Sequence, residues 1–286
     1  MVRKSVLFSP GDQPSLLAKA PESGADVVVF DLEDAVVPDR KREARETVVE
    51  ALADVRGTAP DCERCVRINP LSVGGDADLD ALADASVSPD SLMLPKVDSA
   101  DDIDQLGDAM AERDLDLPVL ALLETAGGVL DAPAIAAADA TDAILLGAED
   151  LSADVGATRT REGTEILYAR ERVVLAASHA DVDAIDTLVT DYEDTDRLAE
   201  DAAFAATLGF DGKMAIHPAQ VPVIEKAFTP DPDEIAWAKR VLSARDEADQ
   251  EGRGVFAVDG EMIDAPLIAQ AETILERAPE EQREDS

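Results

Sequence analysis

The amino-acid sequence predicts an α/β fold, a (β/α)8 TIM barrel with a C-terminal helical and hairpin extension. Eight short apolar runs, rich in Leu, Val and Ile, are spread over the first 218 residues. Each run is too short for a helix but long enough for a strand that is buried on both faces. Amphipathic stretches separate the runs. Eight strands that alternate with helices, with polar residues after every strand, favour a closed barrel over an open, doubly wound sheet.

The predicted strands, with the polar residues that follow them, are 6–12, 27–36, 64–70, 91–97, 118–125, 143–151, 183–191 and 212–218. Helical patterns lie between them, around 15–20, from 41, up to 85, from 99, near 129, around 165–178 and over 194–208. In a barrel of parallel strands the carboxyl ends meet at one face, where active sites are built. We therefore expect residues 1–228 to form a barrel that carries the catalytic site.

The remaining residues, 229–286, have a different pattern. A Pro-rich break is followed by a helical pattern over 234–248. Gly254 and the Asp259-Gly260 pair bracket the apolar run VFAV, which predicts a hairpin-like arm before a final helix. Asp264 stands where that helix is expected to begin, and aspartate is typical of a helix N-cap.

The charge of the chain is strongly acidic. It carries 63 acidic against 25 basic residues, a net charge of −38. A solvated acidic surface keeps proteins soluble in molar salt, so we expect a halophilic protein. The same charge excludes nucleic acid as a partner, because no basic stripe is available to neutralise phosphates.

Cysteines and apolar segments exclude two further classes. Cys62 and Cys65 form a single CERC, and only His179 and His217 could join them in a zinc site. One such pair without a second pair or nearby histidines argues against zinc. The sequence shows neither an N-terminal apolar signal segment nor 18 consecutive apolar residues, which predicts a cytoplasmic protein with no membrane partner.

Two acidic residues, Glu124 and Asp150, stand at the ends of apolar runs. Burying an ionised carboxylate is costly and two neighbouring carboxylates repel, so the arrangement is favourable mainly when a cation lies between them. Two carboxylates that leave the remaining positions to water and substrate suit Mg²⁺. The alternative is that both residues cap the helices that follow, since Thr125 and Ser152 are also typical of helix starts.

Other polar residues follow the predicted strands and should converge at the same face: Ser9, Asp12, Asp31, Glu33, Asp34, Arg67, Asn69, Lys96, Asp186 and His217. Arg67 is the most informative, because a strand-borne guanidinium beside two carboxylates and a metal can clamp a substrate carboxylate. For Asp12, Lys96 and Asp186 a loop position in water or a structural ion pair is an equally good interpretation.

Ten sequence blocks occur in order along the chain: SVLFSPGDQPSLLAKA, VVVFDLEDAVVPDRKREAR, VRINP, LMLPKV, LLETAGGV, LLGAEDLSADVG, LYARERVVLAA, IDTLVTD, LGFDGKMAIHPAQV and GVFAVDGEMIDAP. Together they resemble the HpcH/HpaI aldolase and citrate lyase β-subunit superfamily over nearly the whole chain. The resemblance is greatest to the stand-alone CoA-ester lyases.

This resemblance implies a Mg²⁺-dependent carbon–carbon lyase, with Mn²⁺ able to replace Mg²⁺. The substrate would be a 3-hydroxyacyl-CoA such as malyl-CoA, β-methylmalyl-CoA or citramalyl-CoA, and the products acetyl- or propionyl-CoA and glyoxylate or pyruvate. Alternatives are a citrate lyase β-subunit that acts on a carrier-bound citryl group in a complex, a malyl-CoA thioesterase and a free-acid aldolase.

The resemblance also implies roles for individual residues. Glu124 and Asp150 would hold the metal, and Arg67 would stabilise the oxygen on which negative charge develops. An outer shell of acids would be supplied by Asp31, Glu33 and Asp34.

Further implied roles concern coenzyme A and oligomer formation. Lys41 and Arg45 lie where the CoA phosphates are expected; alternatively, both are exposed cations paired with Glu43 and Glu46. Asp264 would act as an acid or base in the site of a neighbouring subunit. We therefore expect residues 229–286 to pack at a neighbour's active-site face in a homotrimer or hexamer.

Overall fold

The computed structural model describes residues 3–54, 62–85, 88–250, 255–279 and 282. The chain divides into two compact units, Met1–Glu225 and Lys226–Ser286.

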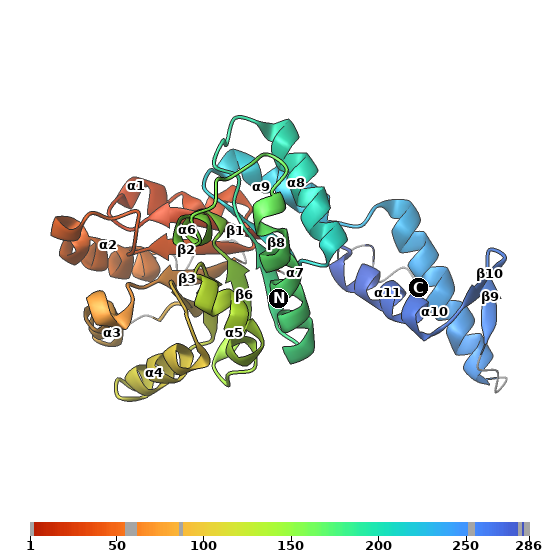
Figure 1. Cartoon of the computed structure of the whole chain (residues 1–286), viewed down its shortest axis with the longest axis horizontal. Helices are drawn as coiled ribbons and strands as arrows, with labels where there is room; N and C mark the ends of the chain where they lie inside the picture. Colours follow the sequence, from red (N-terminus) through yellow and green to blue (C-terminus); the bar gives the residue numbers. More distant parts are fainter. Residues whose placement is uncertain (1–2, 55–61, 86–87, 251–254, 280–281, 283–286) are drawn as a thin grey trace. The chain divides into compact units, whose positions relative to one another are not determined.

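The first unit is a closed barrel of eight parallel strands in sequential order (Figure 1). Pairing of β8 with β1, with Val6 opposite Met214, closes the sheet. The predicted (β/α)8 barrel is therefore confirmed, and the open sheet is excluded. The strands are β1 (Ser5–Pro10), β2 (Val27–Asp31), β3 (Glu63–Arg67), β4 (Ser91–Leu94), β5 (Val119–Leu123), β6 (Thr141–Leu146), β7 (Asp183–Asp186) and β8 (Gly212–Ala215).

Helices follow the strands and surround them (Figure 1). They are α1 (Pro14–Leu17), α2 (Lys41–Asp54), α3 (Gly75–Ala83), α4 (Ala100–Ala111), α5 (Ala126–Ala136), α6 (Ala148–Asp154), α7 (Leu167–Ala180), α8 (Thr195–Leu208) and α9 (Val221–Phe228). Helix α5 begins three residues before the predicted 129, because the Thr125 side chain accepts a hydrogen bond from Gly128 N (2.9 Å) and caps it. The cap is therefore Thr125 and not Glu124, which leaves the Glu124 carboxylate available to the barrel.

The barrel interior follows from the two-residue period of a strand. Val27 and Val29 of β2 and Leu120 and Leu122 of β5 lie in one apolar cluster that Val6, Phe8, Cys65, Met93, Ala143, Leu145, Ile185, Leu188 and Met214 complete. Successive side chains of a strand point to opposite faces of the sheet. The next inward positions toward the carboxyl ends are therefore Asp31, Arg67 and Glu124.

Asp186 has the opposite parity, so the expectation that it lies at the active-site face is wrong, and the alternative of a structural ion pair is confirmed. Because Ile185 lies in the barrel interior, Asp186 faces the helices, where it accepts hydrogen bonds from Arg170 of α7 (2.9 and 3.0 Å) and Lys213 of β8 (2.6 Å). Asp201 of α8 completes the cluster, 2.6 Å from Lys213 Nζ. Lys213 and Asp186 are both fully buried. Asp186 therefore belongs to a structural ion-pair network.

The second unit consists of a helix, a hairpin and a final helix. Its elements are α10 (Pro232–Gln250), β9 (Phe256–Val258), β10 (Glu261–Ile263) and α11 (Ala265–Arg277). The two strands are antiparallel, and both turn residues, Asp259 and Gly260, have positive φ, as a tight two-residue hairpin requires. The predicted arm and final helix are confirmed; Gly254 lies outside the described residues. Nowhere in the described ranges is a helix both long and apolar enough to cross a bilayer.

Candidate active site

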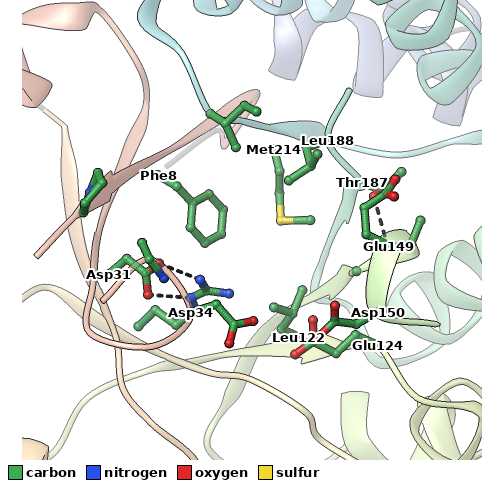
Figure 2. Close-up of a pocket in the computed structure, with 16 residues that line it drawn as sticks. Phe8, Asp31, Asp34, Leu122, Glu124, Glu149, Asp150, Thr187, Leu188 and Met214 are labelled. Carbon is green, nitrogen blue, oxygen red and sulfur yellow. Dashed lines mark hydrogen bonds and ion pairs between the residues drawn. The ribbon is translucent and has the colours of Figure 1, made fainter. Parts of the chain in front are cut away.

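A cavity of about 400 Å³ opens at the carboxyl ends of the barrel strands (Figure 2). Its floor is apolar and comprises Phe8, Leu122, Leu188 and Met214. Its charged lining comprises Asp31, Asp34, Arg67, Glu124, Glu149 and Asp150. The structure thus brings the predicted metal residues, Arg67 and two of the three predicted outer acids to one cavity.

Arg67 is held rigidly at the end of β3. Its Nε and Nη2 donate to the two carboxylate oxygens of Asp31, at 2.8 and 2.6 Å. Nη1 lies 3.3 Å from Glu33 Oε2, and the guanidinium carbon lies 5.0 Å from the Phe8 ring centre. Burial by itself would lower the pKa of Arg67, but the Asp31 hydrogen bonds and charge outweigh it and raise the pKa. Two parallel hydrogen bonds fix the plane of the guanidinium, so its direction is set before any ligand binds.

Asp31 also organises the loop after β2. Its carboxylate accepts hydrogen bonds from the backbone N–H groups of Glu33 (2.8 Å) and Ala35 (3.2 Å). The buried Asp31 side chain therefore orients Arg67 and also shapes the loop that carries Glu33 and Asp34.

Glu124 is 5% exposed and lies at the end of β5. Burial raises the pKa of Glu124 to about 7; the positive charge of Lys96 opposes this shift and the negative charge of Asp150 adds to it. Gly147 makes room for the carboxylate, since a Cβ at that position would lie 2.7 Å from Glu124 Oε2. The carboxylate thus occupies a space that a larger residue at 147 would fill.

Asp150 lies in the first turn of α6, with its side chain 46% exposed. Figure 2 shows its carboxylate beside that of Glu124 at one edge of the cavity. The described residues contain no group of three or more His, Cys, Asp or Glu side chains arranged to hold a metal ion. Glu124 and Asp150 nevertheless fit Mg²⁺, because this ion takes hard oxygen ligands and keeps several positions for water and substrate.

Lys96 is a strand-end candidate whose surroundings the sequence left open. Its Nζ lies 2.5 Å from Glu33 Oε1, 3.6 Å from Asp150 Oδ2 and 3.9 Å from Glu124 Oε1. Burial alone would lower the pKa of Lys96, but the hydrogen bond to Glu33 and the surrounding negative charges raise it. In the sequence, the only indication of these surroundings is that Lys96 stands at the end of a predicted strand. The ion pairs place Lys96 among the carboxylates of the site.

Lys41 and Arg45 both contact the protein. Lys41 Nζ donates to the carbonyls of Leu32 (2.7 Å) and Glu33 (2.5 Å), and Arg45 Nε donates to the fully buried Asp78 (2.6 Å). The alternative pairing with Glu43 and Glu46 is wrong, because the ion-pair partners of these two acids are Arg40 and Arg42. The contact with CoA phosphates stays a prediction.

Asp264 is an exposed residue of the second unit. It is the N-cap of α11, and its side chain accepts a hydrogen bond from Leu267 N (3.4 Å). The predicted capping role is confirmed, whereas the acid/base role stays a prediction.

The lining also includes residues that were not singled out from the sequence, among them Phe8, Leu122, Thr187 and Met214. Thr187 Oγ1 accepts a hydrogen bond from Ala148 N (3.1 Å) and so fixes the start of α6. The two-residue strand period would have found Phe8, Leu122 and Met214, because they occupy inward positions. Of the other strand-end candidates, Asp12 pairs with Arg40 (2.6 Å), and His217 stacks on Tyr192 and caps a short 3-10 helix.

Comparison with known proteins agrees with this geometry. The mitochondrial citramalyl-CoA lyase of Rattus norvegicus is 38% identical over 290 residues, which cover 96% of this chain and 85% of that protein. A citrate lyase subunit beta-like protein of Deinococcus radiodurans is 39% identical over 275 residues, covering 95% and 96%. The crystal structure of CitE from Mycobacterium tuberculosis in complex with magnesium, acetoacetate and coenzyme A has a TM-score of 0.79 at 38% identity and covers 96% of this chain and 98% of CitE.

Residues 4–218 match the sequence profile of the HpcH/HpaI aldolase/citrate lyase family. The match spans the whole barrel, so the resemblance carried by the sequence blocks is confirmed. The chain therefore belongs to the HpcH/HpaI aldolase/citrate lyase family and is an enzyme of the lyase class.

Proposed function

We propose that the protein is a Mg²⁺-dependent carbon–carbon lyase that cleaves a 3-hydroxyacyl-CoA into a shorter acyl-CoA and a 2-oxo acid. The observation that carries the proposal is the cavity in which Arg67, fixed on Asp31, faces Glu124 and Asp150. The names of the relatives support it: one is a citramalyl-CoA lyase, and the CitE structure contains magnesium, acetoacetate and coenzyme A.

The chain's own residues have distinct parts in this reaction. Glu124 and Asp150 would hold Mg²⁺ or Mn²⁺, which when bound supplies a Lewis acid for the hydroxyl and carboxylate oxygens of the substrate. Arg67 presents a fixed positive group to the oxygen that gains negative charge. In other enzymes, removal of such a donor raises the activation free energy by about 3 kcal/mol. Asp31 holds the Arg67 guanidinium in this orientation. Glu33 and Asp34 balance the remaining positive charge of Arg67 and Lys96.

The apolar floor determines which acyl group fits. Phe8, Leu122, Leu188 and Met214 exclude water from one side of the cavity and contact the substrate's alkyl part. One methyl group in such a pocket changes binding by about 1–3 kcal/mol. We propose acetyl- or propionyl-CoA and glyoxylate or pyruvate as the products, since these small groups match a cavity of about 400 Å³.

Coenzyme A and the second unit complete the proposal. We assign the CoA phosphates to Lys41 and Arg45, which must then exchange or share their present partners, the carbonyls after β2 and Asp78. We assign the acid/base role to Asp264 of a neighbouring subunit in a homotrimer or hexamer. A subunit on its own would then be inactive.

A second candidate function is the carrier-dependent β-subunit of a citrate lyase, because the Deinococcus relative is named as citrate lyase subunit beta-like.

The net charge of −38 favours assays in molar KCl, as a halophilic protein requires. The test is a cleavage assay with Mg²⁺ that offers malyl-CoA, β-methylmalyl-CoA and citramalyl-CoA separately and traps the released 2-oxo acid with phenylhydrazine.

Cleavage of one thioester that EDTA, Glu124→Ala and Asp150→Ala each abolish would support the CoA-ester lyase. No cleavage of any of the three by folded, Mg²⁺-loaded protein would contradict it. Cleavage of citryl groups only on an acyl carrier protein would favour the second candidate, and release of free hydroxy acid would favour a thioesterase.

A further inference from the structure

The Lys96 ammonium lies among four carboxylates that come from three strand ends. In the loop after β2, Glu33 Oε1 is 2.5 Å and Asp34 Oδ2 is 3.5 Å from Nζ. At the other edge, Glu124 Oε1 is 3.9 Å and Asp150 Oδ2 is 3.6 Å from it. The last two residues are those that we assign to the metal. The ammonium and a divalent cation would therefore share the same acceptors.

The backbone of Lys96 is bound to the same cluster. Its N–H donates to Glu124 Oε1 at 2.9 Å, and its φ is +55°. This left-handed conformation is unfavourable for a residue with a side chain and persists where surrounding contacts enforce it. Here the conformation lets one residue contact Glu124 through its backbone and reach Glu33, across the cluster, through its side chain.

The charges at the site leave a role for an exchangeable cation. Glu149 of the cavity lining pairs with Arg159 (2.9 Å). Five other acids, Asp31, Glu33, Asp34, Glu124 and Asp150, face two cations, Arg67 and Lys96. Arg67 is committed to Asp31 by two hydrogen bonds. Among the described residues, Lys96 is thus the cation that lies within 4 Å of both proposed metal ligands.

We propose that Lys96 is a positioning residue that acts as the resident counter-cation of the metal site. Before metal binds, its ammonium holds the four carboxylates together against their mutual repulsion. When a divalent cation takes Glu124 and Asp150, the ammonium gives up these two carboxylates and keeps Glu33 and Asp34. This exchange lowers the affinity for metal and keeps the site assembled without it. The inference rests on the metal site proposed above.

The first test compares Lys96→Met with the wild-type protein in molar KCl, using Mn²⁺ binding followed by electron paramagnetic resonance. Lys19→Met is the matched control, because it removes an exposed lysine and changes the net charge by the same amount. We expect Lys96→Met to bind Mn²⁺ at least about tenfold more tightly, since a like charge has left the cluster, and Lys19→Met to be unchanged. A variant that merely disturbs the site would bind metal more weakly.

Thermal melting gives a second readout in the same proteins. Without metal, Lys96→Met should melt at a lower temperature than wild type, because four carboxylates lose their shared cation. Added Mg²⁺ should raise its melting temperature by more than it raises that of wild type. Unchanged or weakened Mn²⁺ binding in folded Lys96→Met overturns the inference.

Glu124→Ala separates the two proposals. If wild type binds no Mn²⁺, or if Glu124→Ala binds it equally well, the proposed metal site fails. If Glu124→Ala loses Mn²⁺ while Lys96→Met binds like wild type, the metal site stands and the role of Lys96 fails.

A measurement on the wild-type protein covers the case in which Lys96→Met does not fold. Acetylation of lysines by acetic anhydride can be mapped by mass spectrometry with and without Mg²⁺. Exchange predicts that Mg²⁺ speeds acetylation of Lys96 relative to Lys19, because the ammonium has lost two of its four partners. A rate that Mg²⁺ leaves unchanged or lowers overturns the exchange.

Discussion

Gly147→Ala tests whether the packing between β5 and α6 sets the geometry of the proposed metal site. The backbone at Gly147 has φ −94° and ψ 86°, so an alanine meets no left-handed strain there. The added Cβ would, however, lie 2.7 Å from both the Cβ and Oε2 of Glu124. The carboxylate oxygen can rotate away, but the Glu124 Cβ can yield only if the end of β5 moves.

The size of the effect follows from these distances. The 2.7 Å separation is about 0.7 Å short of ordinary contact, which begins at 3.4 Å. Metal sites tolerate deviations of about 0.2 Å in ligand distance. We therefore expect Gly147→Ala to weaken Mn²⁺ binding by about 10- to 100-fold, as losses of supporting contacts around metal ligands do. Isothermal titration calorimetry in molar KCl measures this directly.

Gly107→Ala is the matched control. Gly107 lies inside α4, and an added Cβ there meets no atom within 4 Å. It should leave metal binding unchanged and stabilise the protein by about 0.5–1 kcal/mol, the usual gain of alanine over glycine inside a helix. If Gly147→Ala binds Mn²⁺ as tightly as Gly107→Ala, Glu124 either does not bind the metal or is not held by this packing.

Three further predictions concern other parts of the chain. Arg67→Lys should lower kcat by about 10²- to 10³-fold in the cleavage assay with an unchanged circular dichroism spectrum, because lysine cannot keep two parallel hydrogen bonds to Asp31; full activity would remove Arg67 from the mechanism. Asp264→Asn should keep the cap of α11 while Asp264→Ala costs about 1 kcal/mol of stability, and both should lose activity by about 10²- to 10⁴-fold if Asp264 is the acid or base; an active Asp264→Asn would leave it a cap only. Burial, and the negative charge of Asp26, raise the pKa of Glu225 from 4.5 to about 7, although its hydrogen bond to Ser5 opposes the shift. The folded protein then binds more protons than the unfolded chain between these pH values, so this stabilisation is fully present below about pH 4.5 and is lost as the pH rises to about 7. Urea unfolding in fixed KCl should show a loss of about 1–2 kcal/mol over this range, after allowance for the partial exposure of the group, and Glu225→Gln should abolish it; an equal slope in both proteins would contradict the assignment.

The barrel could be predicted because its signals are local. Strand and helix periods repeat within a few residues, and the two-residue period also places Asp31, Arg67 and Glu124 on the inner face once their strands are known. The same rule would have placed Asp186 on the outer face, because it follows the inward Ile185. Position at a strand end alone, without the parity of the strand, does not separate Asp186 from the residues that face the cavity.

The start of α5 shows a limit of local patterns. The sequence pattern predicts the helix near Val129, and Gly127 and Gly128 weaken helix propensity before that position. In the structure Thr125 caps the helix through Gly128 N, and an added Cβ at Gly128 would lie 2.1 Å from the carbonyl oxygen of Val97. A packing requirement from the loop after β4, which carries Val97, thus outweighed propensity.

The sequence by itself determined the fold class, the order of the elements and the placement of Asp31, Arg67, Glu124 and Asp150 at the active-site face, because these follow from periodicity and from the direction of parallel strands. Only the tertiary structure decided which charges pair. Arg67 pairs with Asp31, Lys96 with Glu33, and Arg45 with Asp78, across 36, 63 and 33 positions of the chain. Any of the 63 acids could have been the partner of each cation, since electrostatic attraction depends on distance in space, which closure of the barrel sets.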